Sequence, residues 1–271
     1  MRSRSTILSS ILITLTVGLF LLDLAVGVVN IPIRDVWAAL TGGNCPRATE
    51  KIVLNIRLIK AIVALLAGAA LSVSGLQMQT LFRNPLAGPY VLGISSGASL
   101  GVALVVLAGL GSSIGIAGAA WVGAAVVLLV ITAVGQRIVP SVLVGLLLAV
   151  ITIKSLNLLL FGEEYAITMG LNIQRSRGLL FLSTTLLAGT ITAFCGPIGF
   201  IGLAMPHVTR MLFQNSDHHV LLPGTILSGA SILLLCDVIS KIFTLPINAI
   251  TALLGIPIVV WVVLRNKSIT A

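Results

Sequence analysis

Long apolar runs recur along this chain of 271 residues and constrain its fold more than any other feature. Hydrophobic residues make up 58% of the sequence and charged residues 8%, whereas a soluble domain carries about 25% charged residues. Because a helix of roughly 20 apolar residues can cross a bilayer, several runs qualify as transmembrane spans. The candidate spans are residues 7–29, 52–82, 90–110, 114–134, 179–195, 220–243 and 247–264. We therefore predict an all-α, polytopic transmembrane helical bundle of about eight to nine membrane segments, forming one domain over residues 1–271.

The net charge of +9 does not indicate nucleic acid as a partner. Most basic residues stand at the ends of apolar runs, where membrane topology and anionic lipid account for them. Three scattered cysteines are too few for a disulfide framework. The N-terminal run at 7–29 is long enough to span, so we expect a retained first span and not a cleaved signal peptide.

A polar segment at residues 83–101, RNPLAGPYVLGISSGASLG, separates two of the apolar runs. It holds two prolines, four glycines and three serines, and no acidic residue. Backbone that leaves the helix at membrane depth is tolerated only where protein or a water-filled cavity satisfies its polar groups. The segment is therefore predicted to line a path through the membrane.

Two other segments are too short for simple spans. Residues 198–205 are bounded by Gly196, Pro197 and Pro206, which predicts a half-helix. Residues 141–161 lose their apolar character at Lys154, which favours a shallow re-entrant turn over a span. The alternative is a topology that is inconsistent between the two halves of the chain.

Small residues recur at helical spacing around Gly68 and Gly75 and again around Gly115 and Gly118. Such spacing lets transmembrane helices approach closely, so we interpret most of these glycines as packing positions.

The motifs of several protein classes are missing. The chain has no Gly-x-x-x-x-Gly-Lys-Ser/Thr loop for nucleotide phosphates, and no acid–base or nucleophile constellation of an enzyme. No cluster of intramembrane carboxylates marks the ion relay of a secondary transporter. His207, His218 and His219 have no cysteine or carboxylate at zinc-site spacing, so we expect no metal site and interpret them as structural.

Three sequence blocks carry a resemblance to a known family. They are the segment 83–101, GPIGFIGLAMPHVTR at 196–210 with SDHHVLLPG at 216–224, and LPINAITALLGIPIVVWVVLR at 245–265. Together they resemble the membrane permease subunits of bacterial ABC importers for iron chelates (siderophores and haem) and cobalamin. The resemblance implies ten spans as the family norm, a place in the bacterial inner membrane, and an ATP-driven, alternating-access importer. It does not indicate which chelate is carried.

The resemblance also implies the partners. They are a second copy of the permease in a homodimer, two cytoplasmic ATPase subunits and a periplasmic substrate-binding protein, besides membrane lipid. The permease itself would need no cofactor and would not be an enzyme, because ATP would bind to the partner subunits.

Site residues follow from the same resemblance, position by position. Those of the cytoplasmic gate and pathway are Asn84, Pro85, Leu86, Ser95 and Ser96, with Ile138, Val139 and Pro140 in a second gate loop. Those that couple to the ATPase are Gly162, Glu163, Glu164 and Gly170, in a coupling segment at about 162–177. Those that dock the binding protein are Arg57, Lys60 and Lys241. The alternatives are a plain interhelical turn, a solvated loop and basic side chains that snorkel to headgroups, respectively.

Two departures from the family stand out. Lys60 occupies a position where the family has arginine, and lysine cannot form the bidentate fork to a carboxylate. Family members are also longer, and we expect the missing part between Val150 and Ser155. The alternative function is therefore a transport-inactive remnant or scaffold that lacks part of the fifth and sixth spans.

Overall fold

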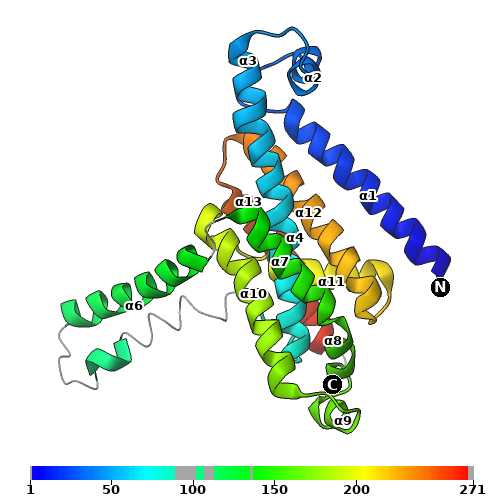
Figure 1. Cartoon of the computed structure of the whole chain (residues 1–271), viewed down its shortest axis with the longest axis vertical. Helices are drawn as coiled ribbons and strands as arrows, with labels where there is room; N and C mark the ends of the chain where they lie inside the picture. Colours follow the sequence, from blue (N-terminus) through cyan, green and yellow to red (C-terminus); the bar gives the residue numbers. More distant parts are fainter. Residues whose placement is uncertain (1, 89–101, 107–112, 135–136, 268–271) are drawn as a thin grey trace. The chain divides into compact units, whose positions relative to one another are not determined.

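The computed structural model describes residues 2–88, 102–106, 113–134 and 137–267 (Figure 1). Every regular element in these ranges is a helix, in agreement with the all-α prediction. The elements are α1 (Arg2–Ala25), α2 (Ile33–Thr41), α3 (Arg47–Ile52), the π-helical turn η1 (Val53–Arg57), α4 (Leu58–Leu81), α6 (Ser113–Val134), α7 (Ile138–Ile151), α8 (Ile153–Leu159), α9 (Glu163–Thr168), α10 (Ile173–Cys195), α11 (Ile201–Phe213), α12 (His218–Phe243) and α13 (Ile247–Lys267).

Within the described residues, four helices are long and apolar enough to cross a membrane. They cover Arg4–Ala25, Arg47–Leu81, Ile173–Cys195 and His218–Phe243, and the bent pair α7–α8 adds a fifth if it counts as one span. The chain is therefore a multi-pass membrane protein. The expected total of eight to nine segments stays a prediction, because most of the run at 90–110 lies outside the described residues.

The chain divides into two compact units. The first unit joins Met1–Leu76 to Pro197–Ala271, and the second is Gln77–Gly196. In the first unit α12 packs along α1 and α11, while α13 contacts α11 and α12. In the second unit α10 packs along α6 and α7, and α9 contacts α8 and α10.

Two glycines of α4 set the packing of the first unit. A Cβ atom added at Gly68 would lie 2.2 Å from the carbonyl oxygen of Gly229 in α12. A Cβ atom added at Gly75 would lie 1.7 Å from the carbonyl oxygen of Gly202 in α11. The predicted packing role is thus confirmed at these two positions, whereas Gly118 in α6 has nothing within 4 Å of an added Cβ.

The predicted half-helix exists, but its bounds differ. Helix α11 begins at Ile201 and continues through Pro206 to Phe213, so the prediction that it ends at Pro206 is wrong. Proline has no N–H, so it leaves the carbonyl four residues earlier, that of Gly202, without its helical donor. Gly75 approaches this same oxygen, and its Cα–H group is positioned for a weak hydrogen bond. At 13 residues, α11 is about 20 Å long, too short to cross the hydrocarbon core of about 30 Å.

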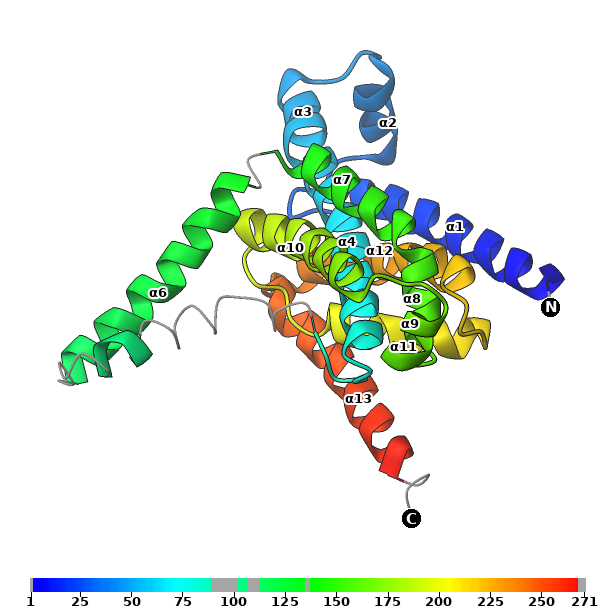
Figure 2. The same ribbon diagram turned by 60° about the horizontal axis from the view of Figure 1, so that its bottom comes forward.

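The segment 141–161 runs antiparallel to α10 within the second unit (Figure 2). The hydroxyl of Ser183 donates to the carbonyl oxygen of Gly145 in α7 at 2.8 Å, and Ser176 near the start of α10 pairs with Ser155 in α8 at 3.3 Å. The two ends of the α7–α8 pair therefore lie at opposite ends of α10. A re-entrant turn would bring them to the same end, so the arrangement favours a span bent by 51° over the re-entrant turn, which stays a prediction.

The second unit places the end of α4 beside α9. One hydrophobic cluster contains Leu81 at the end of α4, Leu159 at the end of α8 and Ala166 in α9. Ile138 begins α7, at the other end of the α7–α8 pair. We therefore expect α9 and Ile138 on opposite sides of the membrane if the α7–α8 pair is one span.

Cysteine labelling tests this arrangement. In a background with Cys45, Cys195 and Cys236 replaced by serine, we expect Met169→Cys and Arg137→Cys to react with a membrane-impermeant maleimide from opposite sides of the membrane. Both positions are exposed, so access depends on the side alone. Labelling of both cysteines from one side in oriented vesicles would contradict a spanning α7–α8 pair.

Substitution of the packing glycines gives a second test. Gly75→Ala places a methyl group against the Gly202 carbonyl, and we expect it to lower the free energy of unfolding by about 1–3 kcal/mol through overpacking. Gly118→Ala is the matched control, since it changes another helical glycine in open space and should have no such cost. Thermal unfolding in detergent measures both, and equal midpoints for the two variants would refute the packing role of Gly75.

Candidate functional site

The predicted gate turn begins where α4 ends. Arg83 adopts a left-handed φ of 47°, and the carboxamide oxygen of Asn84 accepts a hydrogen bond from the backbone N–H of Leu86 at 2.9 Å. The backbone N–H of Ala87 donates to the Asn84 carbonyl at 3.1 Å, so the chain reverses in a tight turn. Ala87 is buried in the hydrophobic cluster of α8 and α9, which fixes the turn next to the coupling segment.

The other gate residues have different outcomes. Leu86 is 47% exposed and Pro85 is half-buried, whereas Ser95 and Ser96 lie outside the described residues. Their roles in a gate stay predictions. The segment Ile138, Val139 and Pro140 was expected in a second gate loop, but it forms the start of α7, at the end of the α7–α8 pair opposite to α9. It therefore does not join the Asn84 turn.

The coupling segment contains a short helix, α9, which has a glycine before and after it and packs on the rest of the second unit. Gly162 precedes α9 with φ of 107°, and Gly170 follows it with φ of 82°, two backbone conformations that favour glycine. Ala166 is fully buried in the cluster below α9. The guanidinium of Arg177 in α10 forms an ion pair with the carboxylate of Glu163, while Glu164 remains exposed. These contacts hold α9 as a rigid projection at the start of α10.

The exposed side of α9 carries polar Glu164 and Thr168, flanked by apolar side chains. Four side chains at or beside it are largely exposed: Phe161 (70%), Tyr165 (46%), Ile167 (58%) and Met169 (58%). The rings of Phe161 and Tyr165 lie 5.3 Å apart, so they form one surface. Because α9 follows a span and precedes another, this apolar surface lies in a connection between spans and suits contact with another protein.

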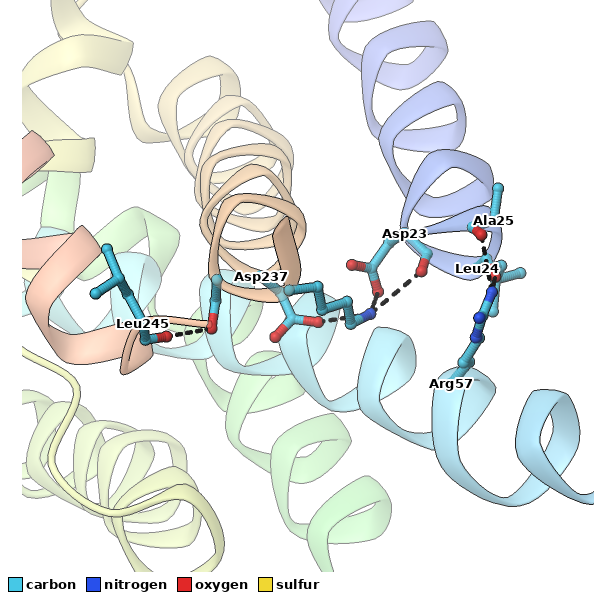
Figure 3. A network of polar contacts seen from close by, with 8 residues as sticks. Asp23, Leu24, Ala25, Arg57, Asp237 and Leu245 are labelled. Carbon is cyan, nitrogen blue, oxygen red and sulfur yellow. Dashed lines mark hydrogen bonds and ion pairs between the residues drawn. The ribbon is translucent and has the colours of Figure 1, made fainter. Parts of the chain in front are cut away.

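Arg57 does not present its charge to the exterior. Arg57 is 4% exposed, and its guanidinium donates to the carbonyl oxygens of Leu24 and Ala25 (Figure 3). It also donates to the carbonyl oxygen of Val29. Leu24 and Ala25 end α1, where carbonyls lack helical partners. Arg57 is the last residue of η1, and this turn positions its side chain. Gly27 leaves room for the guanidinium, because a Cβ atom added at Gly27 would lie 2.8 Å from it.

Lys241 is also held within the chain. Its ammonium nitrogen lies 2.8 Å from a carboxylate oxygen of Asp23 in α1 and 2.8 Å from one of Asp237, and it donates to the Asp23 carbonyl (Figure 3). The Asp23 side chain is fully buried and that of Lys241 is 10% exposed. Of the three residues predicted to dock a binding protein, only Lys60 is exposed. Docking by these residues stays a prediction, and Arg57 and Lys241 have structural partners that the sequence did not reveal.

Asn248 in α13 is a residue that the sequence analysis missed. Its amide nitrogen donates to the Pro197 carbonyl at 2.6 Å, and its amide oxygen accepts from the Gly199 N–H at 3.2 Å. Farther along α13, Gly255 leaves space for Phe200, which has a left-handed φ of 67°. Both contacts hold the break before α11. The sequence showed only that an amide side chain stands in the block 245–265, and it did not indicate which groups that side chain binds.

Comparison with known proteins explains why these elements occur together. The FecCD transport family model matches residues 14–139 and 136–265, which is nearly the whole chain. The chain belongs to the FecCD transport family. The predicted resemblance is thus confirmed, and so are the fold class and the place of this FecCD chain in the inner membrane as a multi-pass protein.

Curated relatives agree with this assignment. The chain is 32% identical to the hemin transport system permease of Yersinia pestis, with 98% of each sequence covered. It is 33% identical to the vitamin B12 import system permease of Shigella boydii, covering 85% of this chain and 89% of the relative. An uncharacterized ABC transporter permease of Bacillus subtilis is 31% identical over 91% of the chain. A solved metal-chelate type ABC transporter in an inward-facing conformation has the same fold, with a TM-score of 0.66 at 23% identity and 97% coverage.

The comparisons also show a loss of sequence. The alignment with the Yersinia permease spans 335 positions, more than the 271 residues of this FecCD chain, so the relative carries sequence that is missing here. The two family matches overlap at residues 136–139. The place of the loss, expected between Val150 and Ser155, stays a prediction.

The ionic contacts of Lys241 lead to a stability prediction. Lys241→Met leaves the buried Asp23 carboxylate without its cation, and we expect a loss of about 3–5 kcal/mol in unfolding free energy. Lys60→Met is the matched control, because an exposed lysine should contribute within about 0.5 kcal/mol. Thermal or denaturant unfolding in detergent gives both values, and similar stabilities would show that the cluster does not hold α1 to α12.

Proposed function

We propose that this chain is the membrane-spanning permease subunit of an ATP-driven importer for a bulky metal chelate or corrinoid, the class that includes ferric siderophores, haem and cobalamin. The observation that carries the proposal is the FecCD match over residues 14–139 and 136–265, the second of which contains α9, together with the exposed apolar side chains at and beside α9. Curated relatives named for hemin and vitamin B12 transport support the substrate class.

In this function α9 is the contact for the ATPase subunits. Its exposed side chains offer a compact apolar surface, and Ala166 and the Glu163–Arg177 ion pair keep that surface fixed on α10. ATP would bind and be hydrolysed on the partner subunits, since the chain has no phosphate-binding loop. A homodimer of the permease with two ATPases would then open its pathway to one side of the membrane at a time.

The periplasmic binding protein would meet the face that carries Lys60. Arg57 and Lys241 already form internal contacts, so Lys60 is the member of the predicted docking set that can pair with an acidic partner. Charge complementarity of this kind sets orientation and speeds encounter.

A second candidate function follows from the sequence that this chain lacks relative to the Yersinia permease. Such a loss would remove part of the fifth and sixth spans of the family. Such a chain could retain α9 and bind ATPases without carrying substrate. This transport-inactive scaffold is separated from the importer by substrate-stimulated turnover.

The test is reconstitution of the permease with its ATPase subunits and binding protein in liposomes. We expect ATP hydrolysis and uptake of one ligand among a ferric siderophore, haem and cobalamin, and at least tenfold loss of both in Ile167→Asp. The aspartate at position 167 would become buried when the ATPase docks on α9, and the cost of burying its charge would oppose docking.

Val139→Asp is the control, since it introduces the same charge at an exposed residue at the far end of the α7–α8 pair. Equal losses in the two variants would argue against α9 as the specific contact. ATPase binding with no stimulation by any of the ligands would favour the scaffold over the importer.

A further inference from the structure

Helix α2 has an apolar surface wider than its contact with the rest of the chain. At 100° per residue, Ala39, Val36, Leu40, Ile33 and Trp37 form one continuous apolar arc, and Thr41, Arg34 and Asp35 form the opposite, polar arc. Val36 and Ala39 are buried, whereas Ile33 is 75% and Trp37 is 63% exposed. Half of the apolar arc therefore faces outward.

The packing of α2 places it at the end of α1. Val36 and Ala39 pack in a cluster with Leu24, the penultimate residue of α1, and with Val53. The apolar part of α1, Arg4–Ala25, is about 33 Å long, so Leu24 lies where the hydrocarbon core ends. Because α2 packs in one cluster with Leu24, at the end of α1, we infer that it lies in the interface between acyl chains and headgroups.

Arg57 ties the connection before α2 to the end of α1. Its guanidinium binds the carbonyls that end α1 and also that of Val29, in the connection to α2. Val28 beside it is 82% exposed, which extends the outward apolar surface toward the end of α1. Figure 1 shows α2 and α3 together beyond the ends of α1 and α4.

We propose that α2 is an interfacial helix bound to phospholipid, with Ile33 and Trp37 among the upper acyl-chain carbons and Arg34 among the phosphates. Tryptophan favours this boundary because its ring is apolar and its N–H can remain hydrated. Arginine on the polar edge complements the phosphate charge. Lipid is the occupant because exposed apolar residues continue along the chain from the last turns of α1 (Leu21 and Leu22) through Val28 and Val29 to Ile33 in α2.

Fluorescence of Trp37 tests the proposal. Trp121→Phe and Trp261→Phe leave Trp37 as the single tryptophan, and the variant is placed in phosphatidylcholine–phosphatidylglycerol vesicles with brominated acyl chains. We expect quenching several-fold stronger by bromine near the headgroup end of the chain than by bromine near the terminal methyl, and little quenching by aqueous iodide. Adding Ile33→Asp should weaken the lipid quenching and increase the iodide quenching.

The control moves the tryptophan to α3. Arg47→Trp combined with Trp37→Phe puts the probe about 9 Å of helix rise beyond Val53, where iodide and not bromolipid should quench it. Quenching of Trp37 by iodide alone would overturn the proposal in favour of a water-facing surface that a soluble partner could bind. Protection of Trp37 from both quenchers would overturn it in favour of cover by a second copy of the chain.

Discussion

Carbonyl groups left open where helices end beside hydrocarbon must find donors within the chain, and this requirement shapes the first unit. Arg57 supplies donors to Leu24, Ala25 and Val29, the last turn of α1 and its exit. Asn248 satisfies the backbone at the break before α11, since it donates to the Pro197 carbonyl and accepts from the Gly199 N–H. Each side chain comes from a different helix than the break it satisfies, so the same hydrogen bonds that solvate the backbone also tie helices together.

Proline within α11 shows how this requirement extends to packing. Pro206 removes the donor for the Gly202 carbonyl, and α4 brings Gly75 against that oxygen. A side chain at position 75 would separate the helices and leave the carbonyl in an apolar environment. The absence of a Cβ there is therefore needed for two reasons, close approach and partial satisfaction of the oxygen.

Sequence patterns predicted the features that depend on local composition, and missed those that depend on contacts across the fold. The spans at 7–29, 179–195 and 220–243 correspond to α1, α10 and α12, because apolar length alone determines them. The register of α7–α8 against α10 could not be predicted from residues 141–161 alone. It depends on hydrogen bonds to another helix, from Ser183 to Gly145 and from Ser176 to Ser155. For the same reason, the motif position of Arg57 suggested docking, while its burial depends on Gly27 and the end of α1.

The connection from α9 to α10 is short and held by backbone and side-chain hydrogen bonds, and this limits how the chain can respond to force. Leu171 donates its N–H to the Ala166 carbonyl, and Asn172 caps α10 by accepting from the Arg175 N–H. With the Glu163–Arg177 ion pair across the junction, α9 has little freedom to move without α10. Because α10 packs along α7 through the Ser183–Gly145 hydrogen bond, a displacement of α9 would carry a pair of membrane helices as one body. Rigid transmission of this kind, and not local refolding, is what the packing of the second unit permits.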